Sequence, residues 1–325
     1  MTAGAGDPAG ARVFVEAPAR LHFGLLDLRG SLGRKFGGIG AAVPEPSLLL
    51  EAERADHVAG SGPDAERACD FARRFLATHG LAGGARLRVH RAIPAHAGLG
   101  SGTQLALGVA RALAELYGLP TDVARLAEAV GRARRSAIGT WAFALGGFIL
   151  EGGRRAGAAA PAPLLAQLPI PGAWRCVVAT PPPARPPMSG AAEEAAFAHL
   201  PPPPQADVER VAHLVLMGVL PALAEGDIVT FGEALSEVQR LTGNWFAPIQ
   251  GGTFAPGPAD GLIRLMREWG AAGVGQSSWG PTVYGVLADE EASAALAARV
   301  RAVLGETGPV YEGGFASTGA RVWRA

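Results

Sequence analysis

The spacing of hydrophobic residues changes near residue 94. Before this point they stand at near-alternate positions: Leu87, Val89 and Ile93. After it they recur every three or four residues: Leu105, Val109, Ala112, Leu113 and Leu116. Alternation is typical of a half-buried strand, and the longer period is typical of an amphipathic helix. The glycine-rich residues between them, 94–104, are therefore predicted to form a turn from a strand into a helix.

Similar patterns predict elements along the rest of the chain. Strands are predicted over residues 12–18, 47–52, 174–180, 309–311 and 320–323. Helices are predicted over residues 65–79, 122–135, 191–199, 207–225, 227–242, 259–270 and 290–304. Residues 139–153 suit either a buried helix or a buried strand, because periodicity does not separate the two. Interleaved strands and helices with short antiparallel returns favour an α+β fold over a doubly wound parallel sheet.

A stretch of small residues and prolines at 156–163 fits a linker between two halves of the chain. A length of 325 residues is also compatible with about two domains. We therefore expect a boundary near residues 155–172, with domains over residues 12–165 and 172–325.

Composition narrows the class of function. The chain holds 29 acidic and 29 basic residues, so no excess of positive charge points to nucleic acid or a membrane surface. Its two cysteines form neither a disulfide framework nor a zinc motif. The first twelve residues lack the apolar core of a signal peptide, and no apolar run reaches the ~20 residues of a membrane span. A cytoplasmic protein acting on small molecules is expected.

The glycine-rich turn is a candidate phosphate site. The first N–H groups of a helix lack intrahelical partners and lie at its positive end, so they can hold an anion. Glycines there let the backbone approach phosphate oxygens closely. The candidate residues are Gly98, Gly100, Ser101, Gly102, Thr103 and Gln104. The turn is neither a Walker loop nor a dinucleotide fingerprint, and a tight turn without any ligand would also require glycines.

Two polar residues, His22 and Asp27, interrupt the apolar run near the start of the chain. Such groups are rare in apolar strands unless they are paired or used. They are candidate catalytic residues, although His22 could instead complete a hydrogen-bond network and Asp27 could cap a turn. Nearby cationic residues are candidate anion ligands: Arg20, Arg34 and Lys35, the only lysine. The basic cluster at residues 132–135 fits compensation of a helix dipole, with Arg135 as a further phosphate candidate.

Several segments carry a family resemblance. Three of them resemble, in order, the motifs of the GHMP kinase superfamily: APARLHFGLLDL, IPAHAGLGSGTQLAL and GVGQSSWGPTVYGV. Six segments together resemble the β-ribofuranosylaminobenzene 5′-phosphate synthase family of methanopterin biosynthesis: RLHFGLLDL, KFGGIG, GLGSGTQLAL, FALGGFILEGG, FAPIQGG and GVGQSSWGPT. The match runs from about Arg12 to Val322. One departure from the kinase pattern is Gly102-Thr103-Gln104, which replaces the usual second serine and the alanines after it.

This resemblance implies a two-lobed GHMP-kinase-like fold with an N-terminal βα domain and a C-terminal ferredoxin-like α+β domain. The implied reaction condenses 5-phosphoribosyl 1-diphosphate with 4-hydroxybenzoate or 4-aminobenzoate, releasing pyrophosphate and carbon dioxide. Mg²⁺ is expected with the diphosphate, no organic cofactor is expected, and a homodimer is implied. An ATP-dependent small-molecule kinase and a non-catalytic binding or dimerisation module stay open as alternatives.

Roles for residues follow from this chemistry. The glycine-rich turn is expected to hold the diphosphate, with Arg20 and Lys35 as further contacts. Asp27 is the preferred catalytic residue and His22 the second. Either could be the base that removes the para-hydroxyl proton, and a carboxylate near C1 could instead stabilise the developing cation or hold magnesium. Five residues are expected to bind substrate in a cleft between the halves: Gln250, Gln276, Ser277, Ser278 and Trp279. Phe246 is a second candidate for stacking on the benzoate.

Overall fold

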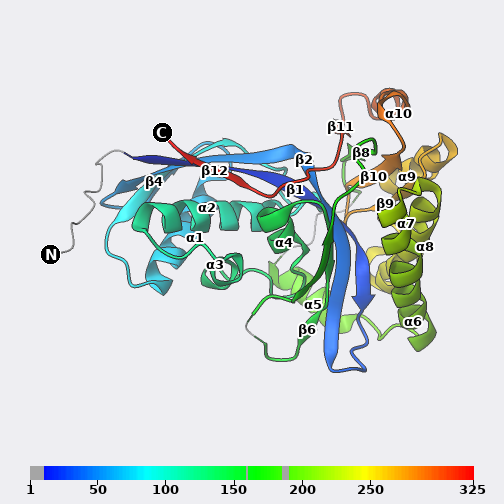
Figure 1. The fold of residues 1–325 in the computed structure, drawn as a ribbon, viewed down its shortest axis with the longest axis horizontal. Coiled ribbons are helices and arrows are strands. Elements are labelled where there is room, and N and C mark those ends of the chain that lie inside the picture. The colour runs from blue at the N-terminus through cyan, green and yellow to red at the C-terminus, as the bar shows by residue number, and fades with distance from the viewer. Residues whose placement is uncertain (1–10, 159, 185–189) are drawn as a thin grey trace.

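A computed structural model describes residues 11–158, 160–184 and 190–325, and for residues 190–194 it describes the backbone alone. Residues 1–10, which include most of the segment expected to lack a signal peptide, lie outside the described residues. In this structure the chain forms two α+β lobes, as the sequence predicts (Figure 1).

The first lobe is built on two long antiparallel strands, β1 (Arg12–Asp27) and β2 (Arg34–Ala55). The predicted short strands at 12–18 and 47–52 are therefore parts of much longer ones. Register shifts occur at Pro18/Ala19 and at His22/Gly24. Beyond these irregularities the hairpin continues past the first lobe and packs against helices of the second lobe (Figure 1).

The remaining strands of this sheet extend it on both sides of the hairpin. Its main path runs β12-β1-β2-β4-β3, and β5, β6 and β7 join through β2 and β5. Their bounds are β3 (Ala59–Ser61), β4 (Gly84–Arg91), β5 (Phe148–Glu151), β6 (Arg154–Arg155), β7 (Leu164–Leu168) and β12 (Arg321–Arg324). Because β12 pairs with β1, the last strand of the chain belongs to the first sheet. The proposed division into residues 12–165 and 172–325 stays a prediction, and this strand crosses it.

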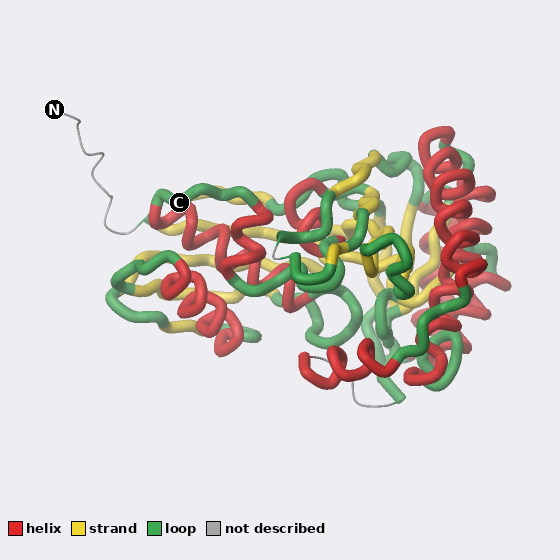
Figure 2. Tube along the Cα trace, turned by 90° about the horizontal axis from the view of Figure 1, so that it is seen from below, coloured by secondary structure: helices red, strands yellow, loops and turns green. Residues whose placement is uncertain are grey.

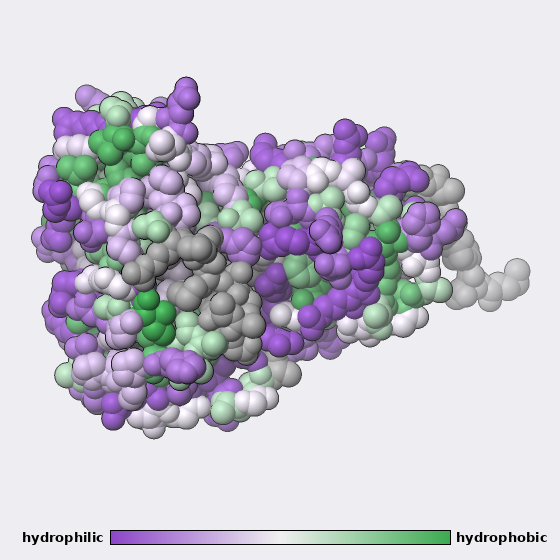
Figure 3. All heavy atoms as spheres, turned by 180° about the vertical axis from the view of Figure 1, so that it is seen from behind, coloured by the Kyte–Doolittle hydropathy of each residue, from purple (hydrophilic) through white to green (hydrophobic). Residues whose placement is uncertain are grey.

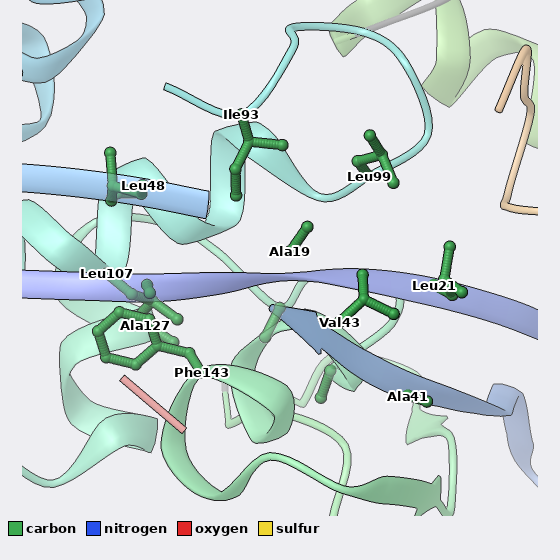
Figure 4. Packing of buried hydrophobic residues seen from close by; sticks show 14 of the residues in the cluster. Ala19, Leu21, Ala41, Val43, Leu48, Ile93, Leu99, Leu107, Ala127 and Phe143 are labelled. Atoms are coloured by element: carbon green, nitrogen blue, oxygen red, sulfur yellow. The ribbon is translucent and has the colours of Figure 1, made fainter. Parts of the chain in front are cut away.

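Four helices cover one face of this sheet: α1 (Ala65–Thr78), α2 (Ser101–Tyr117), α3 (Val123–Ala129) and α4 (Ile138–Leu145) (Figure 1). Eleven of the 17 residues of α2 are buried, so it is the central helix of the layer. Residues of the glycine-rich turn share this core, and Leu99 is fully buried close to Leu21 and Ala19 of β1 (Figure 4). This packing fixes the turn against β1.

Two segments of the first lobe differ from their predicted structure or resolve it. The helix predicted over 122–135 ends at Ala129, because Gly131 and Ala133 have φ angles of 68° and 58° that turn the chain. The ambiguous stretch 139–153 is both a helix and a strand, α4 and β5, separated by Gly146 and Gly147 at φ 68° and 70°.

The second lobe has a four-stranded antiparallel sheet in the order β11-β8-β10-β9. Its strands are β8 (Arg175–Ala179), β9 (Gly273–Gln276), β10 (Val283–Leu287) and β11 (Val310–Gly313). The helices of this half are α5 (Gly190–His199), α6 (Gln205–Leu214), the π-helical η1 (Val215–Val219), α7 (Leu220–Glu225), α8 (Ile228–Gln250), α9 (Pro258–Glu268) and α10 (Glu290–Leu304). Seen from below, the long helices gather at the end of the molecule away from α1 (Figure 2).

Within the described ranges, no helix is both long and apolar enough to cross a membrane. Hydrophilic residues cover much of the face in Figure 3, and the hydrophobic ones form small separate patches.

Candidate active site

A cleft of about 800 Å³ lies between the two lobes. The first lobe contributes β1, the start of α2 and the loop 131–136 to its lining, and the second contributes α8 and the loop after β9. Most ligand sites are clefts of this size at an interface between structural units. This cleft is therefore the candidate active site.

Positive charge concentrates in the cleft although the chain as a whole is balanced. Five arginines line it: Arg20, Arg74, Arg132, Arg134 and Arg135. Of the described lining residues, none is aspartate or glutamate. A cleft lined by one sign of charge attracts ligands of the opposite sign, so this cleft suits an anion with several charged groups.

The N-terminus of α2 lies beside the cleft, which Thr103 of its first turn lines. Its cap residue, Gly100, has φ 80° and supplies no side-chain cap, and no acidic residue stands in the first turn. The N–H groups of Thr103 and Gln104 donate to the Gly100 oxygen at 2.9 and 3.0 Å. Those of Ser101 and Gly102 precede this first turn and lie at the positive end of the helix dipole. This arrangement is compatible with anion binding, and the phosphate site stays a prediction.

Ser277 ties this turn to the second lobe. Its hydroxyl donates to the Gly98 oxygen at 2.7 Å and accepts from the His22 N–H at 2.9 Å. The Arg20 guanidinium donates to the same Gly98 oxygen. Gly98 has φ 81°, and a Cβ atom there would clash with the Ser277 carbonyl oxygen. Gly98 and Ser277 therefore contact each other and join the lobes, and neither is among the residues that line the cleft; their predicted binding of diphosphate and substrate stays a prediction.

His22 lines the cleft and is 7% exposed. Its Nδ1 accepts from the Gly24 N–H at 3.3 Å, which places the proton of the neutral ring on Nε2. Burial and the neighbouring Arg20 lower the pKa of His22 from 6.5 to about 3. A ring this weakly basic is a poor acceptor for a hydroxyl proton. We therefore expect His22 to act as a neutral hydrogen-bonding group.

Asp27 ends β1 and is not itself among the residues that line the cleft. It pairs with Phe36 across the hairpin and stands two residues after Leu25, and both of these neighbours line the cleft. One carboxylate oxygen accepts from the Arg29 and Gly30 N–H groups at 2.6 and 2.9 Å. Asp27 therefore caps the hairpin turn, and its catalytic role stays a prediction.

Lys35 and Arg34 lie near the hairpin turn and do not line the cleft. The aliphatic part of Lys35 packs over Gly30. Arg34 donates to the backbone oxygens of Gly152 and Gly153 at 3.4 and 3.0 Å. Their proposed contact with a substrate anion is not supported by this position.

Thr103 and Gln104, adjacent in the predicted phosphate site, point in different directions. Thr103 lines the cleft. Gln104 is fully buried, and its Nε2 donates to the Gly139 oxygen at 2.9 Å. Its side chain thus connects α2 to α4 in the interior.

Three glutamines form a network on the second-lobe side of the cleft. Gln276 Nε2 donates to Gln250 Oε1 and to the Ser278 oxygen, at 3.2 and 2.9 Å. Gln239, which the sequence did not single out, accepts from the Gln276 N–H at 2.8 Å and donates to the Phe23 oxygen at 2.5 Å. The predicted residues Gln250 and Gln276 do line the cleft, but these bonds show that they organise its wall.

Four aromatic rings line the cleft together and are called the aromatic cluster below: Phe36, Phe197, Phe246 and Trp279. Phe246 and Trp279 are 4.6 Å apart between ring centroids, and Phe197 lies 5.7 and 5.5 Å from them. The Arg135 guanidinium lies 5.2 Å from the Phe197 centroid. Phe246 and Trp279 are thus neighbours in the cleft, and their stacking on the benzoate stays a prediction.

Three lining residues adopt a left-handed backbone that side chains rarely adopt. Phe36, Ala133 and Ser278 have φ 69°, 58° and 58°. Such conformations cost of order 1–3 kcal/mol each and tend to occur at functional sites. Their grouping supports the choice of this cleft.

Glu151 is a buried carboxyl close to the cleft wall. Burial raises its pKa to about 7, although Ser136, the Ala137 N–H and Arg154 act in the opposite direction. Ser136 lines the cleft, but Glu151 itself does not.

The expected Mg²⁺ has no ligand set in the described part of the chain. There, no group of three or more His, Cys, Asp or Glu residues could hold a metal ion. The cleft also presents no described carboxylate to a hard cation. A resident metal therefore does not fit these residues.

The two lobes correspond to a known class of protein. Residues 66–147 match the family model described as the GHMP kinases N terminal domain, and residues 219–306 match the GHMP kinases C terminal model. Homoserine kinase from Cytophaga hutchinsonii has a similar fold, with a TM-score of 0.70, 18% identity and 99% of each chain covered. Galactokinase from Lactococcus lactis gives a TM-score of 0.67 at 14% identity, covering 98% of this chain and 96% of that one.

Sequence comparison identifies a narrower group within this class. The chain is 36% identical over 323 residues to β-ribofuranosylphenol 5′-phosphate synthase from Methanothermobacter thermautotrophicus, covering 93% of this chain and 96% of that protein. The Archaeoglobus fulgidus protein of the same name is 36% identical, with 84% and 87% covered. The chain belongs to the β-ribofuranosylphenol 5′-phosphate synthase family and is an enzyme of this type, which confirms the resemblance seen in its motifs.

Proposed function

We propose that this enzyme joins the ribose of 5-phosphoribosyl 1-diphosphate to 4-hydroxybenzoate, in methanopterin biosynthesis. The products are β-ribofuranosylphenol 5′-phosphate, pyrophosphate and carbon dioxide. The observation that supports this proposal is one cleft with an arginine-lined wall and an aromatic cluster. The names of the relatives favour the hydroxyl over the amino substituent, because they specify a phenol.

The first bond to break is that between C1 of the ribose and the diphosphate oxygen. Its electron pair leaves with pyrophosphate, and positive charge develops on C1 and the ring oxygen. The N–H groups at the start of α2 and the cleft arginines stabilise the departing charge, because donors preorganised in a shielded site lower the barrier. The glycine-rich turn thus acts on the leaving group.

The acceptor ring binds at the aromatic cluster, where edge and face contacts suit a flat aromatic acid. Arg135 beside Phe197 can pair with its carboxylate. The ring carbon bearing the carboxylate attacks C1, and the bond to the carboxylate carbon then breaks. Its electron pair restores the aromatic ring, and carbon dioxide leaves.

Loss of the para-hydroxyl proton pushes electrons toward the attacking carbon. Asp27 is the proposed acceptor of this proton, because it is a carboxylate at the end of β1 next to two lining residues, Leu25 and Phe36, and the proton returns to the phenolate oxygen once carbon dioxide has left. His22 would instead donate from Nε2 to a substrate oxygen. We retain magnesium only as a counter-ion carried by the diphosphate, and no step depends on it.

The test is release of labelled carbon dioxide from carboxyl-labelled 4-hydroxybenzoate in the presence of 5-phosphoribosyl 1-diphosphate and magnesium. Equal amounts of carbon dioxide and pyrophosphate are expected. Release from 4-aminobenzoate alone would overturn the choice of acceptor. If the protein consumes ATP with a small alcohol and does not consume the phosphoribosyl donor, the proposed reaction is wrong.

A further inference from the structure

Glu151, the last residue of β5, is an acid that the proposed reaction does not use. It is fully buried, and in the sheet it pairs with Gly38 of β2 and Leu164 of β7. Its carboxyl group lies beside the hydroxyl of Ser136, which lines the cleft. Glutamate is almost never fully buried unless it is paired, because removing its charge from water is costly. The cleft wall in front of this carboxyl group is therefore the place to look for its role.

That part of the wall is the loop 131–136, between α3 and α4. The loop has no regular secondary structure, and two of its residues have left-handed backbones. Arg154 donates to the backbone oxygen of Arg134. Glu151 lies beside the hydroxyl of Ser136 and the N–H of the next residue, Ala137. Two side chains from the segment that follows β5 or ends it therefore support the loop from behind.

The loop brings positive charge to the glycine-rich turn. Three of the arginines that line the cleft belong to it: Arg132, Arg134 and Arg135. A Cβ atom placed on Gly102 of the turn would lie 3.0 Å from Nη2 of Arg132. The position of the loop therefore decides how closely arginine approaches the proposed diphosphate site.

The start of α4 favours a negative charge where Glu151 lies. Ala137 caps this helix without a side-chain hydrogen bond, and its first turn holds no acidic residue. The first N–H groups of a helix lack intrahelical partners and lie at the positive end of its dipole, so a carboxylate beside them is stabilised. Glu151 therefore supplies from β5 a charge that the sequence of α4 lacks.

Neither carboxylate oxygen of Glu151 has a hydrogen-bond partner of ordinary geometry within the described residues. A buried charge in this condition is costly, and each donor that reaches it lowers the cost. The Ser136 hydroxyl and the Ala137 N–H are the donors beside it. Ionisation of Glu151 therefore draws these donors, and the end of the loop with them, toward β5.

We propose that Glu151 is a positioning residue for the anion-binding wall of the cleft. Its charged carboxylate holds loop 131–136 through the Ser136 hydroxyl and the Ala137 N–H, and in this position the arginines of the loop bind an anion at the glycine-rich turn. When the carboxyl group is neutral the loop is held less firmly, and the anion binds more weakly. The proposal rests on the proposed function for the identity of the anion, which is the diphosphate of the phosphoribosyl donor.

The charge of Glu151 changes near neutral pH, because burial raises its pKa to about 7. The charged groups around it are bases: Arg154, the loop arginines, and Arg34 and Lys35 at the start of β2. Helix α4 and β7 carry no charged residue. His22 lies over Gly38, where a Cβ atom would be 3.3 Å from its ring, and its pKa of about 3 keeps it neutral. Of these described groups Glu151 is the one acid, so the loop should be held above pH 7 and released below it.

The test measures pyrophosphate binding by titration calorimetry at about pH 6 and about pH 8, in the wild type and in Glu151→Gln. Glutamine keeps the shape of the side chain without its charge. Pyrophosphate itself titrates over this range, so the ratio of the two Kd values is compared at each pH. We expect Glu151→Gln to bind about tenfold more weakly than the wild type at the higher pH, and within about twofold of it at the lower pH.

Two further variants make the result specific. Glu53→Gln is the matched control, because Glu53 lies on β2 of the same sheet and pairs with Arg86 outside the cleft; it should bind as the wild type does at both pH values. Ser136→Ala removes one of the two donors and should weaken binding about threefold at the higher pH only. Thermal melting at both pH values checks that each variant is folded, and if Glu151→Gln does not fold, Ser136→Ala alone decides.

A ratio that does not change with pH would overturn the proposal, because it would show that only the shape of Glu151 matters. Tighter binding by Glu151→Gln at the higher pH would also overturn it, because the charge would then only repel the anion. These measurements need no acceptor. An enzyme that binds pyrophosphate with the expected pH dependence but releases no carbon dioxide therefore refutes the proposed reaction alone.

Discussion

The side-chain hydroxyl of Ser277 donates a hydrogen bond of 2.7 Å to the backbone oxygen of Gly98, 179 positions away in the chain. This contact places the glycine-rich turn of the first lobe directly on the loop that carries Ser278 and Trp279. One hydrogen bond therefore links the segment proposed to bind the anion to the loop proposed to bind the acceptor. Any change that separates Gly98 from Ser277 should affect both.

Gly98→Ala tests this connection. The alanine Cβ would clash with the Ser277 carbonyl oxygen, and φ 81° is strained for any side chain. We expect the free energy of unfolding to fall by about 2–4 kcal/mol and pyrophosphate binding to weaken about tenfold. Chemical denaturation and titration calorimetry measure the two effects.

The matched control is Gly118→Ala, at the other end of α2. Gly118 has φ 67°, but a Cβ atom there meets nothing within 4 Å. This variant should lose only about 1 kcal/mol from backbone strain, with normal pyrophosphate binding. Equal effects of the two substitutions would show that the Gly98–Ser277 contact is unimportant.

Trp279→Leu tests the aromatic cluster as the acceptor site. The substitution removes contacts with Phe246 at 4.6 Å and Phe197 at 5.5 Å. A contact between the Trp279 ring and the benzoate ring is worth about 0.5–1.5 kcal/mol, so its loss should raise the KM for 4-hydroxybenzoate up to about tenfold, while the KM for the phosphoribosyl donor stays constant. Trp269→Leu is the control, because Trp269 ends α9 and contacts Arg299 outside the cleft. An unchanged benzoate KM in Trp279→Leu would contradict this assignment.

Local signals explain where the fold was predictable. Helix α10 agrees with its predicted span, 290–304, because Asp289 caps its start and Gly305 ends it. In contrast, the helix predicted over 227–242 continues to Gln250 through Pro248. Prolines usually end helices, so this continuation depends on tertiary packing that a local pattern does not report.

The site was predictable only in part, for a similar reason. Gly98, Ser277 and Trp279 belong to short glycine-rich motifs, so the sequence alone identified them as candidates. Arg74 and Arg132 are 58 positions apart, on α1 and in the loop after α3. Exposed arginines are ordinary in such places, and only the folded structure shows that both line the cleft. Lys35 is the opposite case. It is the only lysine in the sequence and was therefore a candidate, yet it lies near a hairpin turn outside the cleft.

Asp27→Asn separates the catalytic role of Asp27 from its role in the turn. Asparagine keeps a side-chain oxygen for the Arg29 and Gly30 N–H groups but loses the charge. We expect carbon dioxide release to fall about a hundredfold or more, as for loss of a general base, with an unchanged melting temperature. The control is Asp227→Asn, where the aspartate likewise accepts from two backbone N–H groups, of Val229 and Thr230. Wild-type rates in Asp27→Asn would show that Asp27 only caps the hairpin turn and is not the general base.

The titration of His22 predicts how stability depends on pH. The pKa of His22 is lowered to about 3 in the folded protein, against 6.5 for the unfolded group. The neutral ring therefore stabilises the fold fully above pH 6.5, and this contribution is lost as the pH falls toward 3. Its size is about 5 kcal/mol by linkage.

His22→Gln removes this titration and should make the free energy of unfolding less dependent on pH. Urea denaturation from about pH 7 to about pH 4 compares the variant with the wild type and with His57→Gln, whose histidine is exposed. The wild type and His57→Gln should lose stability more steeply over this range than His22→Gln does. Parallel curves for all three proteins would show that His22 is not held in the neutral state by its burial. The base assigned above to Asp27 would then have to be weighed against His22 again.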